Sequence, residues 1–237
     1  EGCKKMSYKK RLDGRKFEET RKMEAKAGVI PRADGSAYFK IGNTIAYAAV
    51  YGPRTLFPRF KQDPQRGILR VNYNMLPFSS KSDRVRPGGS RRSKEISMVT
   101  EKALLPVLDL DEFPNSVVDV FIEFPQTDAG TRCAGICAAS IALADAGLKM
   151  KDMVASVSVG RVDEAVLVDL NYEEEAFDGD VADVPLAFLQ RSKEVSLLQM
   201  DGAITEQQLF KAIEMGQKAC DKIHVIQQKA LKDKYKV

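Results

Sequence analysis

The sequence TDAGTRCAGICAASIALADAGLKM, residues 127–150, carries the strongest local signal in the chain. An Asp-Ala-Gly turn leads into small residues at helical spacing, which predicts a loop and then a tightly packed helix ending at Gly147. The first turn of a helix has backbone N–H groups without internal partners, and Gly130 lets an anion approach them. Thr131 adds a hydroxyl and Arg132 a permanent cation, so the stretch predicts an oxyanion site. The alternative is that Thr131 only caps the helix and Arg132 pairs with a surface carboxylate.

The composition limits the class of protein. A chain of 237 residues that is 44% hydrophobic is typical of a soluble globular protein with one compact core. No apolar run approaches the ~20 residues that cross a bilayer, and the N-terminus is charged, so we expect a cytoplasmic protein without a membrane partner. The single histidine, His224, disfavours a zinc site or a serine–histidine triad and leaves acid–base catalysis to carboxylates. Cys133 and Cys137 lie on the small-residue helix, where packing explains them better than a metal.

Apolar alternation on both sides of this stretch predicts strands. They are expected as three runs within residues 21–50 and at residues 68–78, 116–124, 153–162, 164–172, 183–189 and 193–200. Helices are expected from Arg91 to about residue 108 and after Thr205, where Gln208 completes a capping-box pattern. Two loosely repeated β-rich units, each closed by a helix, make an α+β arrangement. We expect a single domain over residues 1–237, with residues 1–10 frayed.

Basic residues cluster in two places, which matters more for binding a polyanion than the net charge of +4. Arg91 and Arg92 open a predicted helix, where cations oppose the helix dipole, so we expect a negative partner. Arg59 lies between Phe57 and Phe60 in a loop, and aromatic rings interleaved with cations suit single-stranded RNA. The alternatives are a solvated basic surface and an exposed turn whose phenylalanines pack back into the core. We favour the packed position for Phe57 and RNA contact for Arg59.

An acidic run follows the strand expected at residues 164–172. It contains six carboxylates, Glu173, Glu174, Glu175, Asp178, Asp180 and Asp183. The first five are typical of a solvated loop. Asp183 differs because it begins the next apolar strand and is thereby fixed in position.

Three of these features occur together in one known family. The GTR motif at residues 130–132, the Arg91-Arg92 pair after a Pro-Gly loop, and the ADVP motif at residues 182–185 resemble the RNase PH family of phosphorolytic exoribonucleases. Further matching motifs are RLDGR at 11–15, ADGSAY at 33–38, AAVYGPR at 48–54 and LLQMDG at 197–202. The resemblance covers nearly the whole chain and is most similar to the catalytic RNase PH-like subunit of the archaeal exosome.

The resemblance implies a fold, an assembly and an activity. The implied fold is the RNase PH fold of two repeated β-α units (ribosomal protein S5 domain 2-like). The implied assembly is a hexameric ring of three heterodimers with a catalytically silent paralogue, covered by RNA-binding cap subunits. The implied activity is a phosphate-dependent 3′-to-5′ exoribonuclease, in which inorganic phosphate attacks the last phosphodiester of RNA and releases nucleoside diphosphates. The reverse reaction adds 3′ tails.

The same resemblance assigns roles to residues of this chain. Gly130, Thr131 and Arg132 would hold the attacking phosphate. Arg91 and Arg92 would grip the last nucleotides, and Arg59 would contact the incoming strand. Asp183 would act as general acid to the departing 3′-oxygen or, with a second carboxylate, would hold a divalent ion such as Mg²⁺. Charge repulsion opposes phosphate attack on a phosphodiester, so fixed cations and N–H donors suit this reaction.

The acidic run departs from the family pattern. The family has an aspartate six residues before the ADVP aspartate, and that position is Phe177 here, because the turn carries two extra residues. Counting from the preceding strand points to Glu175 as the second carboxylate, whereas counting back from Asp183 points to Asp178. The choice between them bears on metal dependence and rate.

Three other functions fit the sequence less well. A catalytically silent scaffold subunit of the same ring is disfavoured because Arg132, Arg91, Arg92 and Asp183 are all present. A stand-alone enzyme that trims transfer RNA is disfavoured by the archaeal-type motifs. A small-molecule nucleotide-binding protein is disfavoured because the chain lacks a GxxxxGK[ST] pattern.

Overall fold

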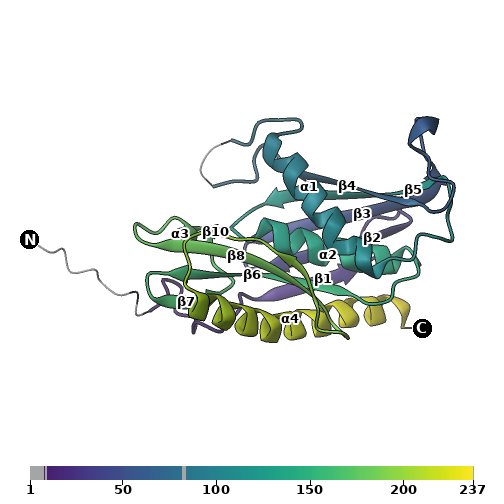
Figure 1. Cartoon of the computed structure of the whole chain (residues 1–237). Helices are drawn as coiled ribbons and strands as arrows, with labels where there is room; N and C mark the ends of the chain where they lie inside the picture. The colour runs from purple at the N-terminus through teal and green to yellow at the C-terminus, as the bar shows by residue number, and fades with distance from the viewer. Residues whose placement is uncertain (1–7, 9, 82–83, 237) are drawn as a thin grey trace, which may run out of the picture.

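The computed structural model describes residues 8, 10–81 and 84–236. Most of the expected frayed segment, residues 1–7 and 9, lies outside the described residues. Two β-sheets, each of five strands, pack with helices between and beneath them (Figure 1). The expected α+β fold class is confirmed.

The first sheet has the strand order β1-β2-β3-β5-β4. Its strands are β1 (Met23–Ala27), β2 (Gly35–Ile41), β3 (Thr44–Thr55), β4 (Ile68–Met75) and β5 (Ser116–Gln126). The first three form the expected antiparallel meander, and β5 continues it antiparallel to β3. Because β4 is parallel to β5, the chain has to cross over between them, and helix α1 (Arg91–Leu104) lies in that crossover.

The second sheet has the order β10-β8-β6-β7, with β9 also paired to β8. Its strands are β6 (Val154–Val162), β7 (Ala165–Val168), β8 (Val181–Leu189), β9 (Val195–Leu198) and β10 (Asp201–Gly202). All of its pairs are antiparallel. The sequence predicted that Asp183 would be the first residue of its strand. Strand β8 instead begins two residues earlier, at Val181. Asp183 is paired on both sides, with Gly160 of β6 and Asp201 of β10.

Helix α2 (Thr131–Asp145) is the tightly packed helix expected from its small residues. Thirteen of its 15 residues are buried, because it packs against β2 and β3 of the first sheet and β6 of the second. Contact is close: a Cβ added to Gly35 of β2 would lie 2.4 Å from the carbonyl oxygen of Ala142. One hydrophobic cluster therefore runs through both sheets and includes Phe39, Phe124 and Phe188.

Local residues set the start of α4 and the end of α1. Helix α4 (Glu206–Tyr235) starts with the expected capping box between Thr205 and Gln208 and runs beneath β6 and β1 (Figure 1). Helix α1 ends at Leu104, earlier than predicted, and a 3₁₀ turn, η2 (Leu105–Val107), follows because Pro106 has no backbone N–H for an α-helical bond. Two short elements complete the fold, η1 (Arg59–Lys61) and α3 (Tyr172–Glu175). None of the described helices combines the length and apolarity required to cross a bilayer.

Candidate active site

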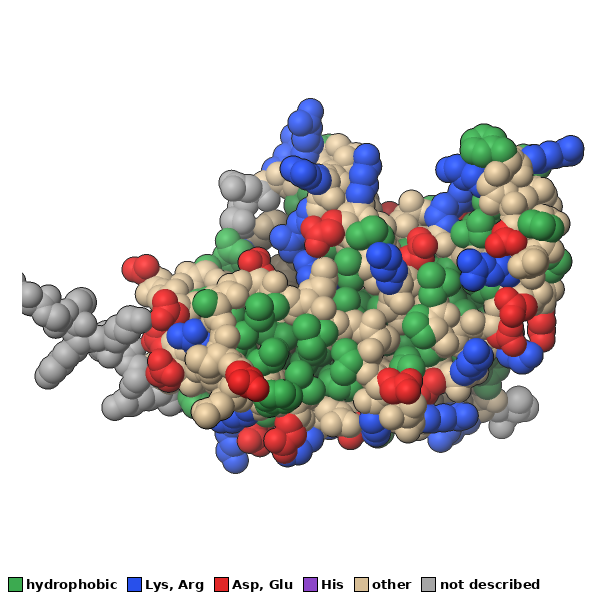
Figure 2. Space-filling view, viewed as in Figure 1, with side chains coloured by type: hydrophobic (Ala, Val, Ile, Leu, Met, Phe, Trp, Pro, Cys, Tyr) green, Lys and Arg blue, Asp and Glu red, His purple; other side chains and the backbone are tan. Residues whose placement is uncertain are grey.

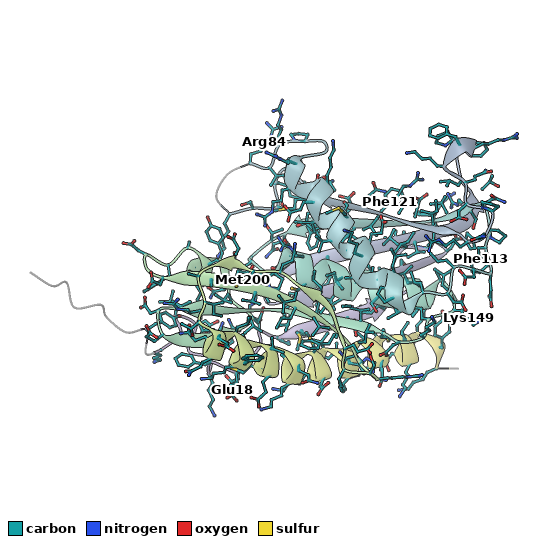
Figure 3. The ribbon with its side chains drawn as sticks, in the orientation of Figure 1. Glu18, Arg84, Phe113, Phe121, Lys149 and Met200 are labelled. Atoms are coloured by element: carbon teal, nitrogen blue, oxygen red, sulfur yellow. The ribbon has the colours of Figure 1, made fainter. Side chains whose placement is uncertain are left out.

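A cavity of about 610 Å³ lies where the two sheets meet at the N-terminal ends of α1 and α2. Its walls include Arg92 of α1, the Gly130–Arg132 segment of α2, Glu175 of α3 and Asp183 of β8. Elements distant in sequence thus bring together the cations, the N–H donors and the carboxylates that the sequence singled out. In the loop before α1, Arg86 also lines the cavity, and Arg84 extends from the same loop (Figure 3). Basic side chains gather over this loop and the start of α1 (Figure 2).

The loop that enters α2 has a fixed and unusual backbone. Ala129 and Gly130 both have positive φ, of 57° and 63°, and Gly130 is the N-cap residue of α2. The hydroxyl of Thr44 donates to the carbonyl oxygen of Ala129 at 2.8 Å and accepts the N–H of Asp128 at 2.9 Å. The guanidinium of Arg21 donates to the carbonyl oxygen of Asp128. These contacts hold a conformation that a free Ala would rarely adopt.

Thr131 does not cap the helix. It is the first helical residue, and its hydroxyl accepts a hydrogen bond from the Tyr73 hydroxyl at 2.8 Å. Because the N-cap residue, Gly130, has no side chain, no side chain caps α2. The capping interpretation of Thr131 is therefore wrong, and the start of α2 keeps the uncompensated N–H groups that an anion can accept.

Arg132 does not meet a surface carboxylate. Its Nη1 donates to the side-chain oxygen of Gln199 at 2.5 Å, and its Nε is buried without a hydrogen-bond partner among the described residues. A buried guanidinium N–H left unpaired costs about 1–3 kcal/mol. An anion in the cavity that Arg132 lines would remove that cost.

Asp183 is half-buried and lines the cavity from strand β8. Burial raises the pKa of its carboxyl, and the negative charge of Asp201 adds to the rise. A hydrogen bond from the Ser158 hydroxyl and the charges of Arg132 and Arg92 act in the opposite direction on the same pKa. Asp183 therefore holds its proton more readily than an exposed aspartate does, which suits a general acid.

Glu175 faces the same cavity from the end of α3. Burial, and then the charge of Asp183, raise the pKa of Glu175 to about 7. The charges of Arg92 and Arg21 and a hydrogen bond from the backbone N–H of Gly130 partly oppose that rise. At neutral pH this carboxyl is poised to exchange a proton.

The other residues of the acidic run lie elsewhere. Asp178 is exposed and is not among the residues that line the cavity, so the structure brings Glu175 and not Asp178 to Asp183. Glu174 is fully buried and binds the guanidinium of Arg11 with bonds of 2.7 and 2.8 Å. The expectation of a solvated loop is thus wrong for Glu174 and Glu175. For Glu174 the reason is local, because its side chain completes the capping box of α3 with Asn171.

The predicted RNA-binding arginines separate into two regions. Both Arg91 and Arg92 are exposed, but only Arg92 lines the cavity. Arg59 lies on η1, away from the cavity, in the dark-blue turn at the upper right of Figure 1. Phe57 and Phe60 beside it are 65% and 84% exposed, so the expectation that Phe57 packs into the core is wrong.

Several cavity residues were not identified as site residues from the sequence. They are Tyr73, Ser158, Tyr172 and Asp201. Gln199, which binds Arg132 but is not itself part of the lining, was also not identified. Asp201 lies in the LLQMDG motif, which matched the family, so its position carried a usable signal. The serine and the first tyrosine are ordinary strand residues, and only the pairing of the strands reveals their position.

The carboxylates also bear on a possible metal. The described residues include no group of three His, Cys, Asp or Glu side chains able to hold an ion by themselves. Glu175 and Asp183 do line one cavity, and Mg²⁺ usually binds through one or two carboxylates together with substrate phosphates. The donor set therefore fits a magnesium ion shared with a phosphate ligand. Cys133 and Cys137 are buried free thiols, and burial raises the pKa of both, as packed residues would show.

Family models match most of the chain. Domain 1 of the 3′ exoribonuclease family matches residues 19–149, and domain 2 of the same family matches residues 152–219. The boundary falls between the two sheets.

Similar proteins in archaea extend over almost the full sequence. The exosome complex component Rrp41 of Methanopyrus kandleri is 48% identical over 95% of this chain and 93% of its own length. The same component from Pyrococcus furiosus is 49% identical over 95% of this chain and 89% of its own length. The Nitrosopumilus maritimus component is 45% identical, with coverages of 95% and 91%.

Solved structures share the fold. Rice (Oryza sativa) Rrp46 superposes with a TM-score of 0.83 at 24% identity, covering 94% of this chain and all of that one. A chain of the Archaeoglobus fulgidus exosome, solved with RNA bound to the active site, superposes with a TM-score of 0.77 at 25% identity, covering 96% and 93%. The chain described here belongs to the 3′ exoribonuclease family, the RNase PH family.

Proposed function

We propose that this chain is the catalytic subunit of an archaeal-type exosome and degrades RNA from its 3′ end by phosphorolysis. The observation that carries the proposal is the convergence of Arg132, the start of α2 and two proton-holding carboxylates on one cavity. Both kinds of nuclease bind the scissile phosphate, but only one that uses phosphate must also hold a second, free phosphate, and the start of α2 with Arg132 offers an anion site in addition to Arg92. The archaeal relatives named as exosome components support the assignment to that complex.

The proposed reaction begins with inorganic phosphate at the N-terminus of α2, held by Gly130, Thr131 and Arg132. An oxygen of this phosphate forms a bond to the phosphorus of the last phosphodiester, and the bond from that phosphorus to the 3′-oxygen breaks. The departing 3′-oxygen takes a proton from Asp183 or Glu175. The products are a nucleoside diphosphate and an RNA shorter by one nucleotide, and reversal of the same steps would add a nucleotide.

Fixed cations lower the main barrier to this reaction, which is the repulsion between two phosphates. Arg132 and Arg92 both line the cavity, and both also act on the pKa of Asp183, so they lie within electrostatic reach of the proposed acid. Arg91 would contact the RNA backbone farther out. In the alternative role, with both carboxyls ionised, Asp183 and Glu175 would hold a divalent ion such as Mg²⁺, which would supply further charge neutralisation at the phosphates.

The assembly completes the proposal. We infer a hexameric ring of three heterodimers with a silent paralogue, RNA-binding cap subunits above it, and action in the cytoplasm. In that ring the exposed η1 loop, with Arg59 between two exposed phenylalanines, would contact the RNA strand before it reaches the cavity.

The test is product analysis. The chain, alone and with a candidate paralogue, is incubated with an oligoribonucleotide labelled in its last nucleotide, with and without phosphate. Phosphate-dependent release of labelled diphosphate is expected, and the change Arg132→Ala is expected to abolish it because the attacking group loses its permanent cation. Labelled monophosphate in the absence of phosphate would indicate hydrolysis instead. No release even with the paralogue would indicate the scaffold function, and full activity of Arg132→Ala would remove the phosphate-site assignment.

A further inference from the structure

Tyr172 is an aromatic residue of the cavity that the proposed reaction leaves without a role. It is the first residue of α3, three positions before Glu175, and side chains three apart lie on the same face of a helix. Both side chains line the cavity, together with Gly130 and Arg92. The ring of Tyr172 is therefore placed beside the proposed phosphate cradle and the proposed acid.

The ring has no partner within the described part of the chain. It is 42% exposed, no other aromatic ring stacks on it, and its hydroxyl makes no hydrogen bond to a described residue. By contrast, the hydroxyls of Tyr8, Tyr73 and Tyr235 each donate a hydrogen bond. An aromatic face left open toward a cavity is available to a flat ligand.

The backbone beneath the ring is fixed to the phosphate loop. The N–H of Tyr172 donates to Oδ1 of Asp128 at 3.2 Å, and Oδ2 of Asp128 accepts from Asn43 at 3.0 Å. Asp128 precedes Gly130 by two residues, so one carboxylate joins the ring to the loop at the start of α2. The backbone that carries the ring therefore keeps a constant position relative to a phosphate bound there.

We propose that Tyr172 is a stacking platform for a nucleobase at the RNA 3′ end. The inference rests on the proposed function, since it requires RNA in this cavity, and it adds a residue that positions the substrate through the base and not through its phosphates. Stacking on an aromatic side chain is worth about 1–3 kcal/mol per base and tolerates any sequence. Tyr172 thus complements the arginines, which recognise only the backbone.

The test compares Tyr172→Phe with Tyr172→Ala and Tyr172→Leu in the assembled protein. The phenylalanine variant keeps a flat ring and is expected to retain the wild-type KM for RNA. The other two remove the aromatic face and are expected to raise that KM by ~10-fold, as the loss of one stacked base predicts. The KM for phosphate should stay within about twofold in all three, because the anion contacts come from other residues. Phe210→Ala, which removes a 63% exposed ring on α4 outside the cavity, serves as the matched control.

A second readout does not depend on turnover. An oligoribonucleotide with 2-aminopurine as its last base is titrated with each variant without phosphate, since the fluorescence of this base falls when it stacks. Quenching is expected with the wild type and Tyr172→Phe, and little with Tyr172→Ala. Equal quenching by Tyr172→Ala, or an equal rise in both KM values, would overturn the inference. So would loss of assembly in Tyr172→Ala, which would assign the ring to a subunit contact. Failure of the wild type to release diphosphate would instead count against the proposed function.

Discussion

Glu174 and Glu175 are adjacent in the chain, but their side chains face different environments. Glu174 is paired with Arg11, which also donates to the backbone carbonyls of Val168 and Asp169, so its charge is compensated. Glu175 faces the cavity, where burial and Asp183 oppose its charge. The cluster of carboxylates is visible in the sequence. Which of the two forms a buried ion pair and which holds a proton is not, because the partner of Glu174, Arg11, lies 163 residues away in the chain. No local pattern carries that information.

The raised pKa of Glu175 predicts a measurable pH dependence of stability. Its folded-state pKa of about 7 lies above the ordinary value of 4.5, so the folded chain keeps a proton that the unfolded chain releases. The contribution is therefore fully present below pH 4.5 and is lost as the pH rises to about 7. Over this range it lowers the free energy of unfolding by up to about 3 kcal/mol. Glu175→Gln is expected to flatten this decline.

The measurement is urea denaturation from pH 4.5 to 7.5 without phosphate or RNA, because bound anions would change the charge balance. Glu173→Gln is the matched control, since Glu173 is an exposed carboxylate of the same short helix. An equal pH slope for Glu175→Gln and the wild type would show that Glu175 ionises as an ordinary carboxyl.

At the scale of elements, the strands and helix starts were predictable because their signals are local. Alternating apolar residues identified the strands of both sheets except β10, whose two residues, Asp201 and Gly202, had been expected as a turn. Thr205 with Gln208 identified the start of α4. The cap of α2 was not predictable in the same way. Whether Thr131 caps the helix or bonds to Tyr73 depends on the left-handed backbone at Ala129. The hydroxyl of Thr44, in β3, maintains that backbone by a hydrogen bond to the carbonyl oxygen of Ala129.

The same contacts predict that Asp128 positions the phosphate loop against α3. Its carboxylate accepts from the N–H of Tyr172 and from Asn43, and the charge of Arg21 lies 3.8 Å away. Asp128→Ala is expected to raise the KM for phosphate by about tenfold, a cost of about 1.4 kcal/mol, because the loop and Glu175 lose their common anchor. The KM for RNA should change less, and Asp128→Asn should recover part of the loss because its amide oxygen can still accept.

The matched control is Asp145, the last residue of α2, which is the helix that follows Asp128 in the chain. Asp145 is as buried as Asp128 and accepts hydrogen bonds from Ser36, Lys234 and Tyr235. Asp145→Ala should lower the melting temperature without changing either KM. If both variants lose stability and neither changes the KM for phosphate, Asp128 has a structural function only.

At the scale of the molecule, the site exists because two sheets from separate halves of the chain meet at the start of α2. The family resemblance predicted that GTR, the paired arginines and ADVP would converge, and Gly130–Arg132, Arg92 and Asp183 do line one cavity, whereas Arg91 does not. Arg59 does not share that cavity, and only the three-dimensional arrangement reveals that its loop forms a second, distant basic region. Binding of an RNA strand by this protein should therefore have a strong electrostatic component, although the net charge is only +4.

This distribution of charge predicts how RNA affinity depends on salt. Each arginine that contacts a phosphate releases a bound counterion, so the affinity should fall linearly with salt concentration on logarithmic axes. Replacing both Arg91 and Arg92 by alanine is expected to flatten that slope by about one to two units. Replacing Lys222 and Lys229, two exposed lysines of α4, removes the same charge away from the cavity and should leave the slope unchanged. The measurement is fluorescence anisotropy of a labelled oligoribonucleotide between low and physiological salt, without phosphate. If both double variants flatten the slope equally, RNA responds to the total charge of the protein and not to the arginines at the start of α1.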